Sequence, residues 1–135
     1  HRSKNQTGPK LLMACLPGDL HETGLLLFAL DASDHGFQTI LLGANMPLDE
    51  FPDAIKKTGS EALVLSGTIE PGDEIIKTLL PRLVKEVSVP VFLGGGVVAS
   101  SFDDLKKSGV LLIGTDTEMG IKQIKKYLGL GSKIK

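Results

Sequence analysis

The sequence predicts an α/β fold, in the form of a doubly wound five-stranded parallel sheet with strand order 2-1-3-4-5. Two observations lead to this fold class. Short apolar segments alternate with segments of helical periodicity along the 135 residues. Each apolar segment is also nearly continuous, which is typical of strands that are buried on both faces. Such an alternation favours a parallel sheet that is covered by helices on both sides.

The predicted strands are apolar runs that are bounded by glycine, proline or polar residues. They cover residues 10–16, 37–42, 61–65, 89–93 and 110–113. The predicted helices begin near Gly24, Pro47, Asp73, Ser101 and Thr117.

Particular residues set the limits of these helices. Gly36 and Gly59 stand where a glycine commonly ends a helix. Pro81 should kink the third helix, because it lacks a backbone donor. Ser101 with Asp104 resembles a capping box at the start of the fourth.

The composition is that of an ordinary globular domain and excludes several classes of function. The formal net charge is −1, so the chain has no basic surface for a nucleic-acid backbone or an anionic membrane. Aromatic residues make up 4% and Trp is absent, which argues against stacking on single-stranded nucleic acid. No apolar stretch reaches the roughly 18–20 residues of a membrane span. The single Cys15 cannot form an internal disulfide, and we expect a reducing, cytoplasmic location.

We expect one domain, at residues 10–135. Residues 1–9 are polar, and they lack the apolar region of a signal peptide. Because the chain does not begin with Met, we expect a processed product or a piece of a longer protein, with residues 1–9 as a linker remnant.

In a doubly wound sheet, ligands bind beyond the carboxyl ends of the strands, around the switch point between strands one and three. The candidate binding residues all lie in segments that follow predicted strands at this edge. They are Asp19, His21, Glu22, Gly24, Ser66, Thr68, Gly94, Gly95, Gly96 and Thr115.

His21 follows Asp19 by two residues, and the pair has two interpretations. It is either a solvated loop pair or a metal ligand whose second ring nitrogen is held by a carboxylate, as metal-bound histidines usually require. One histidine and one carboxylate are too few for a zinc site built by the protein, which takes three or four ligands. A metal would have to arrive with most of its ligands in place, as it does in a macrocycle.

The other candidates also have two interpretations. The glycines Gly94, Gly95 and Gly96 form either a tight turn or a place where backbone lies against a bulky ligand. The hydroxyls of Ser66 and Thr68 either cap the next segment or face a ligand tail. A phosphate loop is a weak alternative, because neither Gly-x-Gly-x-x-Gly nor a following Lys-Ser/Thr is present.

Two other uses of this fold do not match the same edge. A phosphorylation receiver needs an aspartate where Ser66 stands, at the end of the third strand. An FMN site needs a Ser/Thr-rich loop after the first strand and aromatic residues beside the flavin, and this chain has neither.

These motifs resemble the signature of cobalamin-binding domains in the base-off, His-on mode. Such domains carry Asp-x-His-x-x-Gly after the first strand, Ser-x-Leu/Thr after the third and Gly-Gly after the fourth. This chain carries Asp19-x-His21-x-x-Gly24, Ser66-x-Thr68 and three consecutive glycines from Gly94 at those places. The resemblance covers residues 10–128 and implies a flavodoxin-like or Rossmann-like cobalamin-binding fold.

The resemblance also implies a role for each motif. His21 would be the lower ligand of cobalt, in place of the cofactor's own dimethylbenzimidazole, and Asp19 would hydrogen-bond His21. Ser66 and Thr68 would contact the displaced nucleotide tail, which we expect between strands one and three. The glycines after strand four would let the tail run deep, and Gly24 would let its helix start close beneath the corrin.

Residues 42–48, and the absence of Lys-Asn after Gly24, resemble the cobalamin domains of MerR-type transcriptional regulators, which include adenosylcobalamin-dependent photoreceptors. We therefore expect a non-catalytic sensory domain that binds adenosylcobalamin or methylcobalamin. DNA would be contacted only through an N-terminal domain outside this chain, and the full-length protein could form a homo-oligomer. Two alternatives stay open: the cobalamin-carrying domain of a corrinoid methyltransferase or mutase, and an interaction domain without a cofactor.

Overall fold

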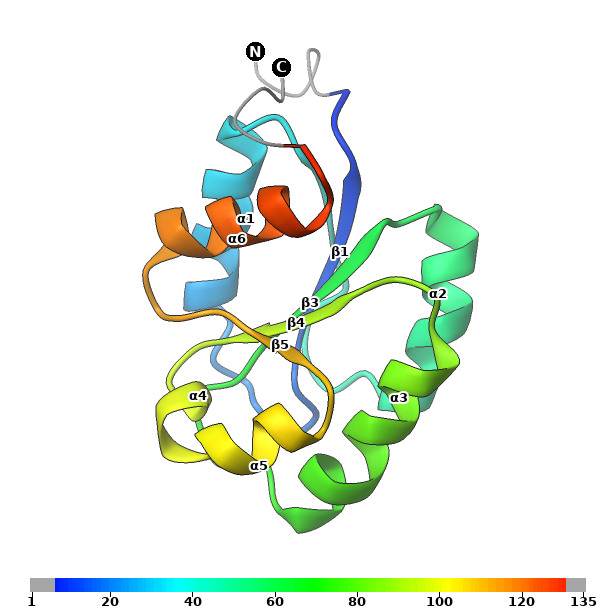
Figure 1. Ribbon diagram of the computed structural model, residues 1–135, viewed down its shortest axis with the longest axis vertical. Helices are drawn as coiled ribbons and strands as arrows, with labels where there is room; N and C mark the ends of the chain where they lie inside the picture. Colours follow the sequence, from blue (N-terminus) through cyan, green and yellow to red (C-terminus); the bar gives the residue numbers. More distant parts are fainter. Residues whose placement is uncertain (1–6, 131–135) are drawn as a thin grey trace.

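The computed structural model describes residues 7–130 and contains the predicted five-stranded sheet (Figure 1). The strand order is β2-β1-β3-β4-β5, and every neighbouring pair is parallel. The strands are β1 (Lys10–Cys15), β2 (Gln38–Leu41), β3 (Ala62–Ser66), β4 (Val91–Gly94) and β5 (Leu111–Leu112). The predicted fold class and strand order are confirmed.

Helices cover both faces of this sheet. One face carries α1 (Thr23–Asp34) and α6 (Thr117–Tyr127), which lie side by side (Figure 1). The other face carries four shorter helices, whose buried residues share one core cluster. They are α2 (Phe51–Thr58), α3 (Leu80–Glu86), α4 (Val97–Ser100) and α5 (Phe102–Lys107).

Strand β1 shows why an uninterrupted apolar run forms the centre of this sheet. Leu12 and Ala14 belong to the core beneath α2–α5, whereas Leu11 and Met13 belong to the core beneath α1 and α6. All four are fully buried. Successive side chains of a strand point to opposite faces, so positions 11–15 of β1, which are all buried, must be apolar. Burial of each large aliphatic side chain contributes about 1.5–3 kcal/mol, which makes β1 a main source of the fold's stability.

The observed limits of most strands differ from the predicted ones by one or two residues. Strand β5 has only two residues in the ladder, although the apolar run extends over residues 110–113. Val110 and Ile113 are nevertheless buried. Apolar side chains thus continue into the core beyond the hydrogen-bonded ladder, and an apolar run overestimates the length of a strand.

The second and third predicted helices are each divided. The second begins with a 3₁₀ turn, Leu48–Glu50, for which Pro47 is the extended N-cap rather than the first helical residue, and α2 follows and ends at the left-handed Gly59. In the third, a π-helical turn, Ile75–Leu79, precedes α3. The amide of Leu80 bonds to the carbonyl of Ile75, so the chain widens just before Pro81, which has no amide to donate.

The predicted capping box at Ser101 is wrong. Ser101 does precede α5, but its side chain makes no capping hydrogen bond. Its hydroxyl instead donates to Glu70 Oε2 at 3.3 Å. The short helix α4, directly before Ser101, was not predicted from the sequence. Within residues 7–130, no helix is long and apolar enough to cross a membrane.

Candidate functional site

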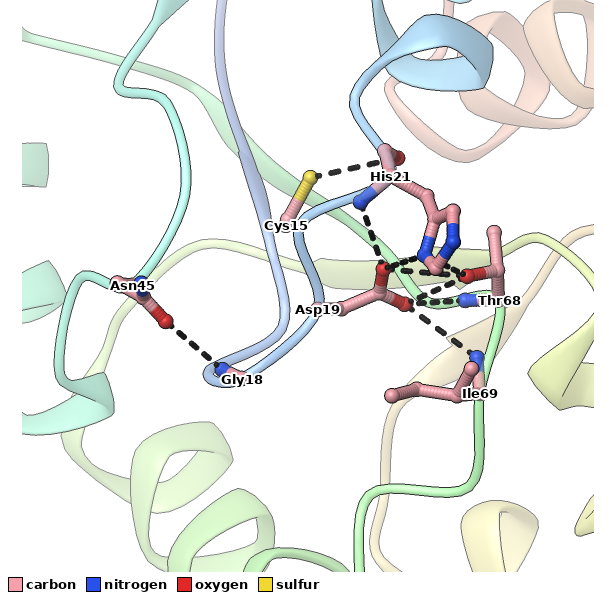
Figure 2. Close-up of polar contacts among 7 residues, drawn as sticks. All are labelled: Cys15, Gly18, Asp19, His21, Asn45, Thr68 and Ile69. Carbon is pink, nitrogen blue, oxygen red and sulfur yellow. Dashed lines mark hydrogen bonds and ion pairs between the residues drawn. The ribbon is translucent and has the colours of Figure 1, made fainter.

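The loop after β1 holds a buried carboxylate at the carboxyl edge of the sheet. Asp19 is only 1% exposed and accepts hydrogen bonds from two loops (Figure 2). The amide of His21 donates to Asp19 Oδ1 at 3.0 Å. From the loop after β3, the amide and the hydroxyl of Thr68 both donate to Asp19, and the amide of Ile69 donates at 3.4 Å. Asp19 therefore joins two strand ends that are almost fifty positions apart in sequence.

These hydrogen bonds determine the ionisation of Asp19. Burial by itself would raise the pKa of this carboxyl, because it removes water from the charged form. The donors from Thr68 and His21 outweigh that effect and lower the pKa of Asp19 to about 2. Asp19 is thus a carboxylate at neutral pH and can only accept hydrogen bonds.

The His21 ring is oriented by this carboxylate. Its Nδ1 lies 3.0 Å from Asp19 Oδ1 and 3.0 Å from Thr68 Oγ1 (Figure 2). Because the carboxylate can only accept, and the Thr68 hydroxyl gives its proton to the carboxylate, the proton of a neutral His21 lies on Nδ1. The lone pair is then on Nε2, and the side chain is 67% exposed. His21 therefore presents a lone pair, in a fixed orientation, to a ligand outside the protein.

A second contact holds the same loop from the other side. The amide of Gly18 donates to Asn45 Oδ1 at 3.1 Å (Figure 2). Asn45 adopts a left-handed backbone with φ 66°, a conformation that asparagine tolerates better than most residues. Asn45 belongs to segment 42–48, which resembles the cobalamin domains of MerR-type regulators. Its observed role is to anchor the turn that precedes Asp19.

A cleft of about 240 Å³ opens between α1 and the carboxyl ends of β3, β4 and β5. Six of the predicted binding residues line it: Gly24, Ser66, Thr68, Gly94, Gly95 and Thr115. A tail is predicted at the carboxyl ends of strands one and three; these strands, β1 and β3, are hydrogen-bonded neighbours, and Thr68 from the loop after β3 lines this cleft. The position of a tail stays a prediction, and this cleft is the space over the α1 face of β3 and β4.

The glycines at this edge serve two different purposes. Gly95 has φ +99°, and a Cβ on it would lie 2.4 Å from the carbonyl oxygen of Gly67. Glycine is thus required there by the fold itself, because the loops after β3 and β4 touch through their backbones. At Gly24, by contrast, a Cβ would meet no atom within 4 Å. Gly24 leaves open space at the rim of the cleft.

Two predicted residues lie outside both the cleft lining and the cluster around Asp19. Glu22 is the exposed N-cap residue of α1 and makes no capping hydrogen bond. Gly96 is the exposed N-cap of α4. The structure therefore brings Asp19, His21 and Thr68 into one hydrogen-bonded cluster but leaves Glu22 and Gly96 outside both the cluster and the cleft.

Sequence reasoning missed most of the cleft wall. Leu25, Leu27 and Phe28 of α1 line the cleft, with Val64 and Ile113 from the sheet. An apolar residue at helical or strand spacing indicates burial but not a cavity, so the sequence pattern does not mark these five as binding residues. Their signal is their position, because each lies one or a few residues from a predicted motif at the carboxyl edge.

The donor set excludes a metal site that the protein builds alone. Among residues 7–130, no group of three or more His, Cys, Asp or Glu side chains could hold a metal ion. His35, the other histidine that the structure describes, bonds through Nδ1 to the carbonyl of Asp31 at 2.9 Å. His21 thus provides a single exposed nitrogen, which suits a metal that brings its remaining ligands with it.

Comparison with known proteins places this site in a family. A family model described as the B12 binding domain matches residues 9–122. The HTH-type transcriptional repressor CarA of Myxococcus xanthus is 29% identical over 89 residues, which are 65% of this chain and 31% of that protein. The glutamate mutase sigma subunit of Escherichia coli O157:H7 is 27% identical over 95 residues, which are 69% of this chain and 64% of that subunit. The chain thus spans about a third of the first relative and just under two thirds of the second.

The fold comparison agrees with the family model. The monomethylamine corrinoid protein of Methanosarcina barkeri superposes with a TM-score of 0.75 over 93% of this chain and 61% of that one. At 23% identity, this likeness concerns the fold. The family model, by contrast, covers most of the sequence. The chain belongs to the B12 binding domain family.

Proposed function

We propose that this domain binds cobalamin in the base-off, His-on mode, with His21 Nε2 as the lower ligand of cobalt. The observation that carries the proposal is the orientation of the His21 ring. Its Nδ1 is 3.0 Å from both Asp19 Oδ1 and Thr68 Oγ1, so its exposed Nε2 carries the lone pair. Metal-bound histidines are usually oriented by a carboxylate in this manner. When bound, the cofactor supplies a cobalt ion whose upper ligand can be exchanged or cleaved.

The surroundings of His21 fit a flat macrocycle. Leu20 and Ile69, which adjoin His21 and Thr68 in sequence, are large apolar side chains with 65% and 50% of their surface exposed. Exposed apolar groups beside a polar cluster are common at ligand sites. Below them, the cleft under α1 offers room for the nucleotide tail that leaves the cobalt when His21 takes its place.

The role proposed for the domain is that of the sensory part of a transcriptional regulator. Two observations support it. A transcriptional repressor is among the relatives, at 29% identity. Segment 42–48, which resembles the regulator branch, also contains Asn45, the residue that anchors the loop of Asp19 and His21. In this role the domain is not an enzyme, and the upper ligand would be adenosyl or methyl.

With a net charge of −1, the chain has no excess of positive charge to attract DNA, so we expect a regulator to contact DNA through another domain. Cobalamin can shift the state of that domain only if it makes different contacts in the two states. We therefore expect cobalamin to bridge this sheet and a neighbouring segment of the full-length protein. Location in the cytoplasm and assembly of a homo-oligomer belong to the same proposal.

A second candidate is the cobalamin-carrying domain of a mutase or methyltransferase. The observation that favours it is the similarity to a glutamate mutase subunit, which is 27% identical over a slightly longer stretch than the repressor. In that case the cofactor would do its chemistry with a partner subunit, and this chain would position it.

The full-length protein encoded by the gene distinguishes the two roles. Its binding to DNA from its own upstream region is measured without cofactor, with adenosylcobalamin and with methylcobalamin, in darkness and in light. The regulator proposal expects a change in DNA affinity with at least one cofactor form, and a lower cobalamin affinity for residues 1–135 than for the full-length protein. DNA binding that is absent, or that no cofactor form or light condition changes, would contradict the regulator role and favour the carrier.

A further inference from the structure

We propose that the cleft under α1 selects the lower base of the corrinoid: it accepts an apolar aromatic base, such as a benzimidazole or a phenol-derived ring, and discriminates against a purine. This inference rests on the proposed function, because it assigns the cleft to the nucleotide tail of the cofactor. It adds a choice among natural corrinoids that differ only in that base.

The inner wall of the cleft has no polar side chain. Leu25, Phe28, Val64 and Ile113 line it, and each is at most 8% exposed. Phe28 and Ile113 converge, because a Cβ built on Gly120 would lie 3.0 Å from Phe28 Cε1 and 3.4 Å from Ile113 Cδ1. A ring that enters the cleft to this depth therefore meets only hydrocarbon from the side chains.

The hydroxyls of the cleft belong to the strand ends and to the start of α6, and two of them are already engaged. Thr68 bonds to Asp19 and His21, and Thr117 donates to Asp31 Oδ2 at 2.9 Å. Within residues 7–130, no hydrogen bond engages the hydroxyl of Ser66 or Thr115. Ser66 ends β3, and Thr115 follows β5 by a short turn. The available polar groups therefore suit the ribose and phosphate of a tail, and the base lies deeper.

The size of the cleft agrees with this division. Its volume of about 240 Å³ is below the roughly 300–1,000 Å³ of pockets that enclose a whole drug-sized ligand. It accommodates a ring system rather than a complete nucleotide. A purine placed there would bury ring nitrogens and an exocyclic amine without partners, at a cost of roughly 5- to 150-fold in affinity.

The test compares four corrinoids by visible titration and calorimetry with residues 1–135: cobalamin, a corrinoid with an adenine lower base, one with a p-cresol lower base, and cobinamide, which has no nucleotide. The decisive pair is adenine against p-cresol. The phenolic ring has no nitrogen to offer cobalt and adenine coordinates it only weakly, so His21 displaces little from either. We expect the p-cresol form to bind roughly 5- to 150-fold more tightly than the adenine form.

A matched pair of variants assigns the preference to the cleft. Val64 and Val91 are both strand residues that are 2% exposed, but they face opposite cores. Val64→Thr places a hydroxyl in the cleft wall and should reduce the preference for p-cresol over adenine severalfold. Val91→Thr carries the same chemical change away from the cleft and should leave the preference unaltered. If Val64→Thr does not fold, the comparison in the parent protein still tests the proposal.

The outcomes separate the two proposals. If no corrinoid binds, or if the bound spectra give no sign of a histidine ligand, the proposed function fails. Another outcome is that corrinoids bind with spectra that show a histidine ligand, while the adenine form binds at least as tightly as the p-cresol form. That result overturns the selectivity and leaves the proposed function standing. If cobinamide binds as tightly as the adenine and p-cresol forms, the tail lies outside the cleft, and the selectivity is likewise overturned while the proposed function stands.

Discussion

At the scale of single residues, Asp19 determines what the site can do. Its carboxylate is almost fully buried, yet it is stabilised as an anion by donors from the loops after β1 and β3. A buried charge of this kind is costly unless it is well hydrogen-bonded. Asp19 is therefore arranged to hold the His21 ring, and the fold provides the donors that make this arrangement stable.

Replacement of Asp19 by Asn should weaken cobalamin binding by roughly 10–100-fold, as is typical when the group that orients a metal-bound histidine is lost. Asn keeps the size of the side chain but removes the charge that holds the Nδ1 proton. Titration of the visible spectrum measures the affinity. Asp53→Asn, which removes an exposed charge on α2, is the matched control. Equal affinities of the two variants would contradict the orienting role.

Asp19 should also make the stability of the cofactor-free protein sensitive to acid. The pKa of Asp19 is about 2 in the folded protein against an ordinary value of 3.8. A lowered pKa gives stability that is fully present above about pH 4 and is lost as the pH falls through about 2. We expect this contribution to be on the order of 2 kcal/mol.

Denaturant titrations of the parent and of Asp19→Asn at pH values from about 5 down to about 2 measure it, because the two proteins differ only in this side chain. The difference in the free energy of unfolding should shrink toward low pH. A difference that stays constant across this range would show that Asp19 has no lowered pKa.

Two glycines should respond to substitution in opposite ways. Gly24→Leu should keep the fold and lower cobalamin affinity by roughly 5- to 150-fold, because its Cβ meets open space at the cleft rim that a tail would need. Gly95→Ala should destabilise the fold itself, because its Cβ would lie 2.4 Å from the carbonyl oxygen of Gly67. Thermal unfolding and cobalamin titration of both variants test this. A stable Gly95→Ala, or a Gly24→Leu that binds normally, would contradict it.

At the scale of elements, the starts of the helices show which local signals the fold uses. Asp116 caps α6, with its side chain accepting from the amides of Glu118 and Met119. Ser101 precedes α5 without capping it. Asp116→Ala should therefore cost about 0.5–2 kcal/mol of stability. Ser101→Ala should cost less, since it loses only a long bond to Glu70. Chemical denaturation measures both, and the reverse order would contradict this account of the caps.

The same elements show what could be predicted from the sequence. The sheet and its strand order could be predicted, because apolar runs such as residues 11–15 are required wherever a strand is buried on both faces. The hydrogen bond between Asp19 and His21 could also be predicted, because the two residues are only two positions apart in the chain. The second contact of His21, with Thr68, comes from a loop 47 positions away and depends on how β1 and β3 are placed.

Other features depended on packing that a pattern does not contain. The capping box at Ser101 was wrong because the short helix α4 directly before it redirects the chain, and Ser101 reaches Glu70 instead. The apolar wall of the cleft was not predicted, since Phe28 and Ile113 have the same apolar signature whether they fill a core or line a cavity. The roles of the binding residues toward a cofactor stay predictions.

At the scale of the whole molecule, the sheet order brings the site together. The loops after β1 and β3 are adjacent because these strands are neighbours, and this contact joins Asp19 to Thr68. The loops after β3, β4 and β5 meet on the α1 side and form the cleft. The exposed nitrogen of His21 and the cleft thus lie at one edge of the domain, where a macrocycle and its tail would be held by different parts of the same surface.

The measurement that tests the central claim most directly is the electron paramagnetic resonance spectrum of bound cob(II)alamin, with the histidines of the protein labelled with ¹⁵N. The unpaired electron of cobalt couples to the nitrogen of its lower ligand. Ligation by His21 predicts a doublet splitting in the labelled protein, a triplet in the unlabelled protein, and loss of the labelled doublet in His21→Ala. A triplet that persists in the ¹⁵N-histidine protein would mean that dimethylbenzimidazole remains on cobalt and would contradict the claim, as would the absence of any nitrogen splitting.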